Sequence, residues 1–359
     1  MSEKNISTKV YRKRSIILNV LPFIPAVLVF LCIRLANGKS EIIERYYSQG
    51  LYPQIAKCLS FFSNFFPFSL WDLFLTISVL LIIIGLILVV FRKLKPGWYG
   101  LRLAQYLAVL YSFFYIVWGF NYFRPAIETR LGWTKPNADV NVFRSILDSV
   151  IVQTNLSYDS VSVSDYSAID KLIEESFLTN SGKIGIRYPN GSRRPKPMIF
   201  SSFIAKVGIS GYFGPFFSEV HLNSSLLPMD YAFSLAHEKS HQFGITNEGE
   251  ANLLAFIVCT TSDDKRLRYS GNLFLLLYFL DDASHLKDYH EYVKKIDKDV
   301  IKDLRYRRKY YESLDNKTLD DAQSAVYNTY LKANHIEAGV KNYNQVVALV
   351  ISWYQNRSK

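Results

Sequence analysis

A long uncharged apolar run at residues 73–91 constrains this chain more than any other feature. The run reads LFLTISVLLIIIGLILVVF, close to the roughly 20 apolar residues that a helix needs to cross the hydrocarbon core of a bilayer. Two further uncharged runs lie at residues 16–33 and 103–120. Pro22 and Pro25 interrupt the first, and a membrane helix tolerates them when neighbouring helices satisfy the freed carbonyls. The sequence therefore predicts three transmembrane helices, at about 16–35, 70–91 and 103–122.

A cleaved signal peptide is the alternative interpretation of the first run, because a basic stretch precedes it at Lys9, Arg12, Lys13 and Arg14. No small-residue cleavage signature follows the run, and this favours a membrane anchor.

Basic residues cluster in two short segments, which predict the orientation. Residues 1–15 carry five basic residues and one acidic residue, a net charge of +4. The segment between the second and third runs carries another net charge of +4, which comes from Arg92, Lys93, Lys95 and Arg102. Because such segments stay on the cytoplasmic side, we expect residues 37–68 and the chain after Arg124 on the opposite side of the membrane.

The remaining charge argues against a nucleic-acid partner. The two basic segments account for eight units of the net charge of +11, so the rest of the chain carries only +3. A nucleic-acid-binding domain needs a basic footprint on its globular part. Three cysteines are too few for a disulfide framework, and an apolar content of 49% is too high for a disordered chain.

We expect a membrane domain at residues 1–123 and a mainly α (α+β) extracytoplasmic domain at residues 124–359. Helical spacing of apolar residues marks residues 143–151 and 169–177, with a break at Gly182. Asn190 and Gly191 form a hairpin signal, and residues 198–203 and 217–223 resemble strands. In the second strand, Glu219, His221 and Asn223 would share one polar side. Charged helices with solvated faces are expected at 285–314, 319–333 and 343–354.

One segment carries the candidate chemistry. Pro228 suits the first turn of a helix, and apolar residues recur at helical spacing through Phe243. His237 and His241 lie four residues apart, so their side chains project from one face and can hold one metal ion. Glu238 lies about a third of a turn round, where it can reach a metal-bound water without ligating the metal. This is the H-E-x-x-H pattern of zinc hydrolases.

A catalytic zinc ion usually has three protein ligands, so a third is expected nearby. Gly244 can end the helix and Asn247 can cap the next one, which places Glu248 in its first turn. Asn252 shares a face with Glu248 and can hydrogen-bond a ligand histidine. Glu250 points elsewhere, so Glu248 is the preferred ligand and Glu250 the reserve. The plain structural alternative is that these carboxylates only favour the positive end of the helix dipole.

These residues resemble the gluzincin branch of zinc metallopeptidases, in which a Glu downstream of the two histidines is the third ligand. The resemblance implies a zincin-like domain with His237, His241 and Glu248 as zinc ligands. It also implies Glu238 as general base and Asn252 as the support of a histidine.

Six stretches carry a second resemblance and occur in order along the chain, at residues 45–53, 67–69, 121–125, 211–217, 236–252 and 268–270. Through them nearly the whole chain resembles an uncharacterised family of bacterial membrane proteins, domain of unknown function 3810. The resemblance implies an envelope protein with three spans and a metallopeptidase-like outer domain. Lys239 stands where that family more often has an apolar residue, and it would place a cation beside the base.

The expected protein is a membrane-anchored zinc metallopeptidase of the bacterial cytoplasmic membrane, with a periplasmic or otherwise extracytoplasmic site. Glu238 would take a proton from a zinc-bound water and pass it to the leaving amine. His221, Tyr269 and His285 are candidate donors to the oxyanion. A peptide or protein substrate could add to the edge of the strand at 217–223. The alternative is a catalytically inactive zincin-like protein with a structural, partner-binding or sensing role.

Overall fold

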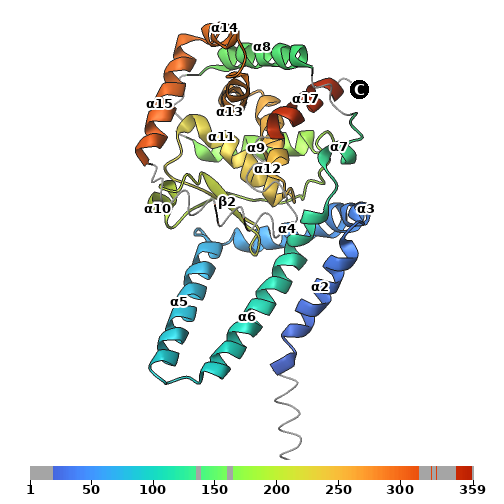
Figure 1. The fold of residues 1–359 in the computed structure, drawn as a ribbon, viewed down its shortest axis with the longest axis vertical. Helices are drawn as coiled ribbons and strands as arrows, with labels where there is room; N and C mark the ends of the chain where they lie inside the picture. Colours follow the sequence, from blue (N-terminus) through green and yellow to red (C-terminus); the bar gives the residue numbers. More distant parts are fainter. Residues whose placement is uncertain are drawn as a thin grey trace, which may run out of the picture.

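The computed structural model describes residues 19–134, 139–159, 165–314 and 345–357, together with the single positions 325 and 329. The described chain is mostly helical. Three apolar helices extend from one side of a compact helical unit (Figure 1). This arrangement separates a region suited to lipid from a region with its own core.

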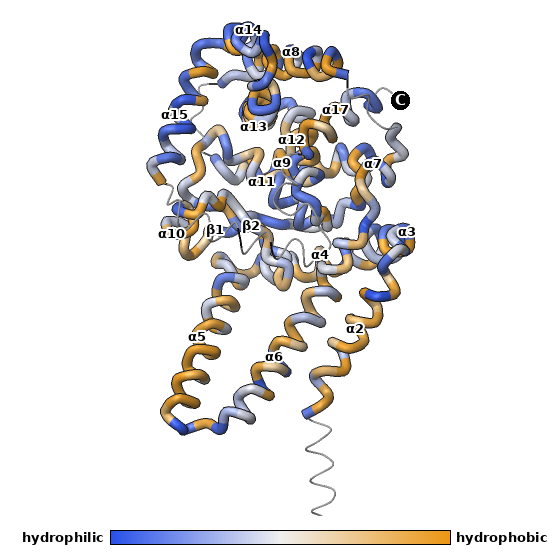
Figure 2. The backbone as a smooth tube through the Cα atoms, in the orientation of Figure 1, coloured by the Kyte–Doolittle hydropathy of each residue, from blue (hydrophilic) through white to orange (hydrophobic). Residues whose placement is uncertain are grey.

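Within the described residues, two helices are long and apolar enough to cross a membrane, α5 (Leu70–Val90) and α6 (Pro96–Val117). A third span results only if the bent pair Phe23–Ala36 and Ser40–Ser63 is counted as one. Figure 2 shows the apolar residues concentrated along α2, α5 and α6. Most large apolar side chains of α5 are exposed, as expected of a surface that meets lipid.

The first predicted span lies partly outside the described residues, which begin at residue 19. Its described helix, α2 (Phe23–Ala36), begins directly after Pro22 and has 14 residues. Proline fixes φ and lacks an N–H, so it fits at a helix start better than in an interior. Because residues 19 and 20 are also helical and residues 21 and 22 form a turn, Pro22 lies at a break between two helical stretches, directly before α2.

Residues 37–68, which lie between the first and second apolar runs, are largely helical. They form α3 (Ser40–Ile42), a π-helix (Ile43–Leu51) and α4 (Tyr52–Ser63). Helix α4 lies between the ends of the apolar helices and the helical unit (Figure 1). Its buried residues include Tyr52, Pro53 and Ala56, so the segment is a packed layer rather than a surface connection.

The third predicted span is displaced toward the N-terminus. Helix α6 has Pro96 in its first turn and includes Arg102, whereas the sequence run begins after that charge. It ends at Val117 and continues as a 3₁₀ helix, Gly119–Phe123. Arg102 lies near the end of α6, where a long charged side chain can reach the membrane surface.

The helical unit has one core built around α12 (Glu248–Thr260), in which every residue except the last is buried. The near-absence of polar residues in 253–259 explains this position. Helices were correctly predicted within 143–151 and 169–177, which lie in α8 and α9. Other helices of this unit include α7 (Ile127–Arg130), α8 (Val140–Ser157), α9 (Tyr166–Asn180), α11 (Pro228–Gln242), α13 (Lys265–Ala283) and α17 (Val346–Asn356).

The charged C-terminal region breaks into shorter helices than expected. Residues 285–314 contain α14 (Tyr289–Lys294) and α15 (Lys298–Leu314), and Ile296 between them is buried. The prediction of a helix at 319–333 lies outside the described residues, apart from positions 325 and 329.

A three-stranded sheet has the order β1 (Lys196–Pro197), β3 (Glu219–Leu222), β2 (Gly211–Gly214). Strand β3 pairs with β1 in parallel and with β2 antiparallel. The predicted strand at 217–223 is therefore present, but it is the central strand and its polar side is buried. A substrate cannot add to it, because both of its edges are already paired.

Two other predictions in this region are wrong. Residues 198–203 do not form a strand, because a helical turn, α10 (Ser201–Ala205), begins within them. The Ser201 hydroxyl donates to the Met198 carbonyl (3.0 Å), and the Asn223 side chain donates to the Ser201 carbonyl (3.1 Å). Asn190 and Gly191 lie in an irregular segment, and the next strand, β1, pairs with the distant β3 instead of folding back as a hairpin.

Candidate functional site

Helices α11 and α12 place the two histidines and Glu248 against one another. Pro228 occupies the first turn of α11, and Gly244 follows its end with φ of 84°, a conformation that favours glycine. The side chain of Asn247 accepts a hydrogen bond from the N–H of Glu250 (2.9 Å) and caps α12. The predicted stop and cap are therefore confirmed.

The C-terminal end of α11 is held by residues of the membrane-proximal layers. The Tyr52 hydroxyl donates to the Gln242 carbonyl (2.7 Å), and the Trp118 indole donates to the His241 carbonyl (3.0 Å). Arg124 donates to the Gly244 carbonyl (2.9 Å). Carbonyls at a helix end need such partners when they are buried. The backbone at the second histidine is therefore fixed by the region next to the apolar helices.

His237, His241 and Glu248 are brought together, and we call them the histidine–glutamate cluster. The two Nε2 atoms are 3.1 Å apart. Glu248 Oε2 lies 3.1 Å from His237 Nε2 and 3.4 Å from His241 Nε2. With bonds of about 2.0–2.1 Å, two ligand atoms of a tetrahedral zinc ion lie about 3.3 Å apart. The three atoms therefore have the spacing of one face of such a site.

The second nitrogen of each histidine fixes its tautomer. His241 Nδ1 lies 2.7 Å from the Ile245 carbonyl, which can only accept, so Nδ1 carries the proton. His237 Nδ1 lies 2.8 Å from Asn252 Oδ1 and is assigned the same way. In the neutral rings both Nε2 lone pairs then face the Glu248 carboxylate. Three acceptors that converge in this way call for a cation between them.

The charges of the cluster agree with this arrangement. Burial alone would lower the pKa of His241, but the Glu248 carboxylate outweighs it and raises that pKa to about 9. Burial alone would raise the pKa of Glu248, but the two histidines hold it well below its usual value. The carboxylate is therefore ionised, and in the absence of a metal ion a proton on His241 is the cation that balances it.

Glu238 lies beside the cluster without joining it. Its side chain is buried, and burial raises its pKa against the opposing effect of His237 and His241. Within the described part of the chain, no hydrogen bond or ion pair engages its carboxylate. Strand β2 begins against it, because a Cβ on Gly211 would lie 2.7 Å from Glu238 Cγ. Glu238 is thus a partly desolvated base beside a strand.

Glu250, the reserve ligand, points away from the cluster. It accepts a hydrogen bond from the N–H of Ile127 (2.9 Å) and pairs with the buried side chain of Arg130. The preference for Glu248 over Glu250 agrees with this geometry.

Lys239 does not lie beside the base. Its ammonium is fully buried and pairs with Asp170 (2.8 Å) and Glu174 (2.6 Å) of α9. Arg193 also pairs with Glu174 (2.9 Å). The expected cation next to Glu238 is therefore on another face of α11, in a closed group of paired charges.

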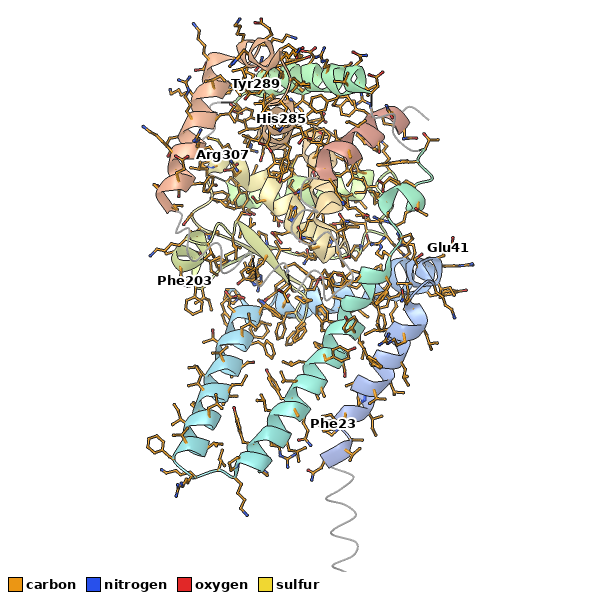
Figure 3. The ribbon with its side chains drawn as sticks, in the orientation of Figure 1. Phe23, Glu41, Phe203, His285, Tyr289 and Arg307 are labelled. Carbon is orange, nitrogen blue, oxygen red and sulfur yellow. The ribbon has the colours of Figure 1, made fainter. Side chains whose placement is uncertain are left out.

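The three candidate oxyanion donors do not line the cavity that holds the cluster. Tyr269 is buried and donates to Asp303 (2.8 Å). His285 is exposed and lies near the end of the helical unit farthest from α5 and α6 (Figure 3). His221 is fully buried, and its Nε2 lies 2.7 Å from the Ser69 hydroxyl at the start of α5.

His221 belongs to a second group, the junction cluster, formed by Lys196, Glu219 and His221. Glu219 accepts hydrogen bonds from the N–H groups of Trp71 (2.9 Å) and Leu70 (3.3 Å), the first residues of α5. Lys196 pairs with Glu219 (3.3 Å). A carboxylate at a helix N-terminus is favourable, so this cluster fastens the sheet to α5.

Tyr278 of α13 is a cavity residue that sequence reasoning missed. It lines the same cavity as the histidines, Glu238 and Glu248. Burial raises the pKa of its hydroxyl, and the nearby Glu248 adds to that effect. No local motif surrounds it in the sequence, so only the assembled fold places it at the cavity.

The family model described as "Protein of unknown function (DUF3810)" matches residues 47–351. No curated protein and no solved structure matches the chain.

Proposed function

The chain belongs to the DUF3810 family, and from the geometry of its site we propose that it is a membrane-anchored zinc metallopeptidase. His237, His241 and Glu248 would hold the metal ion. The observation that carries the proposal is the convergence of two imidazole lone pairs and a carboxylate at distances of 3.1 to 3.4 Å. Nitrogen and carboxylate donors at this spacing suit zinc.

The bound zinc would act as a Lewis acid, lowering the pKa of water and polarising a peptide carbonyl. Glu238 takes the proton from the attacking water and delivers it to the leaving amine. Its burial and raised pKa suit a group that must both accept and release a proton. Asn252 holds the ring of His237, and the Tyr278 hydroxyl donates to the oxyanion.

Strand β2 supports a peptide as the substrate. Its pairing with β3 uses one edge, and within the described residues no other strand pairs with it. Residues Gly211, Tyr212 and Phe213 also line the cavity next to Glu238. An extended peptide can add to such an edge through its backbone. We therefore propose that the substrate pairs with β2 and not, as first expected, with the strand at 217–223, which is β3.

The basic segments support three spans, with the N-terminus in the cytoplasm and the helical unit outside the cytoplasmic membrane. In this arrangement α2 would belong to the first of the three spans.

The test is peptide hydrolysis by the purified full-length protein loaded with zinc, compared with Glu238→Gln. Loss of a general base should slow hydrolysis by about 10²- to 10⁴-fold, while Glu238→Gln should keep its zinc because Glu238 is not a ligand. Hydrolysis that is equal in both proteins would contradict the proposed role. Zinc binding without any Glu238-dependent hydrolysis would favour the inactive, structural or sensing alternative.

A further inference from the structure

The cavity that holds the histidine–glutamate cluster continues into the membrane region. It has a volume of about 1180 Å³ and is lined both by α11–α13 and by α5 and α6. From α5 it is lined by Leu75 and Thr76, and from α6 by Leu107, Leu110 and Phe114. These residues belong to the two helices that are long and apolar enough to span a membrane. One cavity therefore joins the site to these two apolar helices.

Hydrogen bonds join α5 to α6 near the middle of the two helices and in the half that lies farther from the helical unit. The Tyr99 hydroxyl donates to the Ile82 carbonyl (2.8 Å), and its ring packs so closely on Gly85 that a Cβ there would clash with it. Ser78 and Tyr106 are hydrogen-bonded at 2.6 Å. One turn nearer to the helical unit, the residues of both helices line the cavity instead.

The cavity is open on its membrane side. Leu75 and Leu107 line it, yet their side chains are 41% and 53% exposed. Phe200 also lines it and is 53% exposed. These residues both line the cavity and reach the surface of the molecule, which points to an opening between α5, α6 and the segment that begins α10. Its rim is apolar and is suited to lipid-embedded groups.

The segment around α10 forms an apolar surface at the level of the bilayer. Ile199, Phe200 and Phe203 are each more than half exposed. Figure 3 shows Phe203 at the lower edge of the helical unit, beside the upper end of α5. The Ile199 N–H donates to Asp72 of α5 (2.9 Å), which fixes this segment next to the membrane helix. Exposed aromatic residues in this position are favoured where a protein meets a membrane surface.

We propose that the substrate is a polypeptide with a membrane-embedded apolar segment, which enters laterally between α5 and α6 and is cut next to that segment. The free edge of β2 favours a polypeptide over a lipid, because it offers backbone donors and acceptors beside Glu238. The exposed apolar lining favours a membrane-embedded chain over a soluble peptide. This inference rests on the proposed peptidase activity.

The experiment uses the full-length, zinc-loaded protein in phospholipid vesicles. One probe is a mixture of short randomised peptides in solution, and the other is the same mixture fused to a leucine–alanine span of about 20 residues. We measure the ratio of Glu238-dependent cleavage of the fused mixture to that of the free mixture. The expected ratio is about tenfold or more, because the span delivers the peptide to the site from within the bilayer.

Matched variants separate entry through the cavity from simple concentration at the membrane. Leu107 and Val109 lie on α6 and are 53% and 47% exposed, but only Leu107 lines the cavity. Leu107→Trp should bring the ratio close to one, and Val109→Trp should leave it unchanged. Thr76→Trp narrows the cavity from α5 and should repeat the effect of Leu107→Trp. Zinc content confirms that each variant is folded.

Three results would overturn the inference while leaving the proposed function intact. One is cleavage of the free mixture at the same rate as the fused mixture. Another is an equal effect of Leu107→Trp and Val109→Trp. The third is labelling near Leu107 by a photoactivatable phospholipid that the fused peptide does not displace, which would assign the cavity to lipid. No Glu238-dependent cleavage of either mixture would instead contradict the proposed peptidase itself.

Discussion

Two buried groups of histidine and glutamate lie near the same sheet, and they differ in what their polar atoms face. In the junction cluster, Glu219 accepts from two N–H groups of α5, and His221 bonds Ser69. In the histidine–glutamate cluster, the Nε2 atoms and the Glu248 carboxylate face one another beside a large cavity. The same residue types thus fasten one interface and, at the other, bring together three groups with the spacing of metal ligands.

The difference shows how to separate structural from chemical groups in this protein. Burial does not separate them, because His221 and Glu219 are buried at least as deeply as His237 and His241. The decisive property is whether backbone donors and other side chains supply the complementary charge. In the junction cluster α5 and Lys196 supply it, whereas the histidine–glutamate cluster requires a proton or a metal ion.

The largest contrast is expected when the two neighbouring carboxylates of α12, Glu248 and Glu250, are each replaced by glutamine. Glu248→Gln removes a ligand, so zinc affinity should fall by more than the roughly 10- to 100-fold typical of losing an outer partner. Glu250→Gln leaves Arg130 buried without its charge partner, which should lower the free energy of unfolding by about 3–5 kcal/mol without weakening zinc binding. Zinc titration and thermal unfolding measure both. Normal zinc affinity in Glu248→Gln would show that Glu248 is not a zinc ligand.

The junction cluster should respond in stability and not in metal binding. Glu219→Gln removes the charge that faces α5 and Lys196, and we expect a loss of about 3 kcal/mol in the free energy of unfolding. Glu291→Gln is the matched control, since its ion pair with Lys294 is exposed and should contribute nothing measurable. Weakened zinc binding in Glu219→Gln, with stability unchanged, would show that the two clusters are not distinct in role.

The paired charges around Lys239 predict a pH dependence of stability. Burial opposes ionisation of Glu174, but Lys239 and Arg193 outweigh it and lower its pKa from 4.5 to about 2. Because the folded pKa lies below the unfolded one, this contribution is complete above pH 4.5 and is lost as the pH falls toward 2. It amounts to about 3 kcal/mol at neutral pH.

The measurement is the difference in unfolding free energy between the wild-type protein and Glu174→Gln as a function of pH. The difference should be largest near neutral pH and should shrink below pH 4.5. A difference that stays constant down to pH 2 would show that the ionised carboxylate of Glu174 is not the source of this stabilisation.

The smallest effect is expected from the partner of His237. Asn252→Leu removes the acceptor for Nδ1, and zinc affinity should fall by about 10- to 100-fold. Asn252→Asp keeps an acceptor at the same place and should bind zinc nearly as well as the wild-type protein. Equal loss in both variants would indicate that Asn252 acts through packing and not through its hydrogen bond.

Local spacing allowed much of the site to be predicted. The four-residue interval of the histidines, the stop at Gly244 and the cap at Asn247 depend on contacts within one or two helical turns. The same holds for the choice of Glu248 over Glu250, since residues 248 and 252 share a helix face. These features were accessible because helix geometry alone relates the residues involved.

The misassigned features depend on contacts between distant segments. Lys239 meets Glu174, 65 residues away, and His221 meets Ser69, 152 residues away. The central position of β3 follows from pairing with β1, which spacing within residues 217–223 cannot reveal. Tyr278 and the membrane face of the cavity likewise emerge only when α5, α6 and α13 are assembled.

The most direct test of the central claim is the zinc content of the purified full-length protein and of His237→Ala. We expect one zinc ion per chain in the wild-type protein and loss of stoichiometric zinc in His237→Ala, because two remaining ligands hold the ion poorly. Glu219→Gln, which alters the junction cluster, should retain its zinc. Absence of stoichiometric zinc from the wild-type protein, or equal zinc in His237→Ala, would contradict the account.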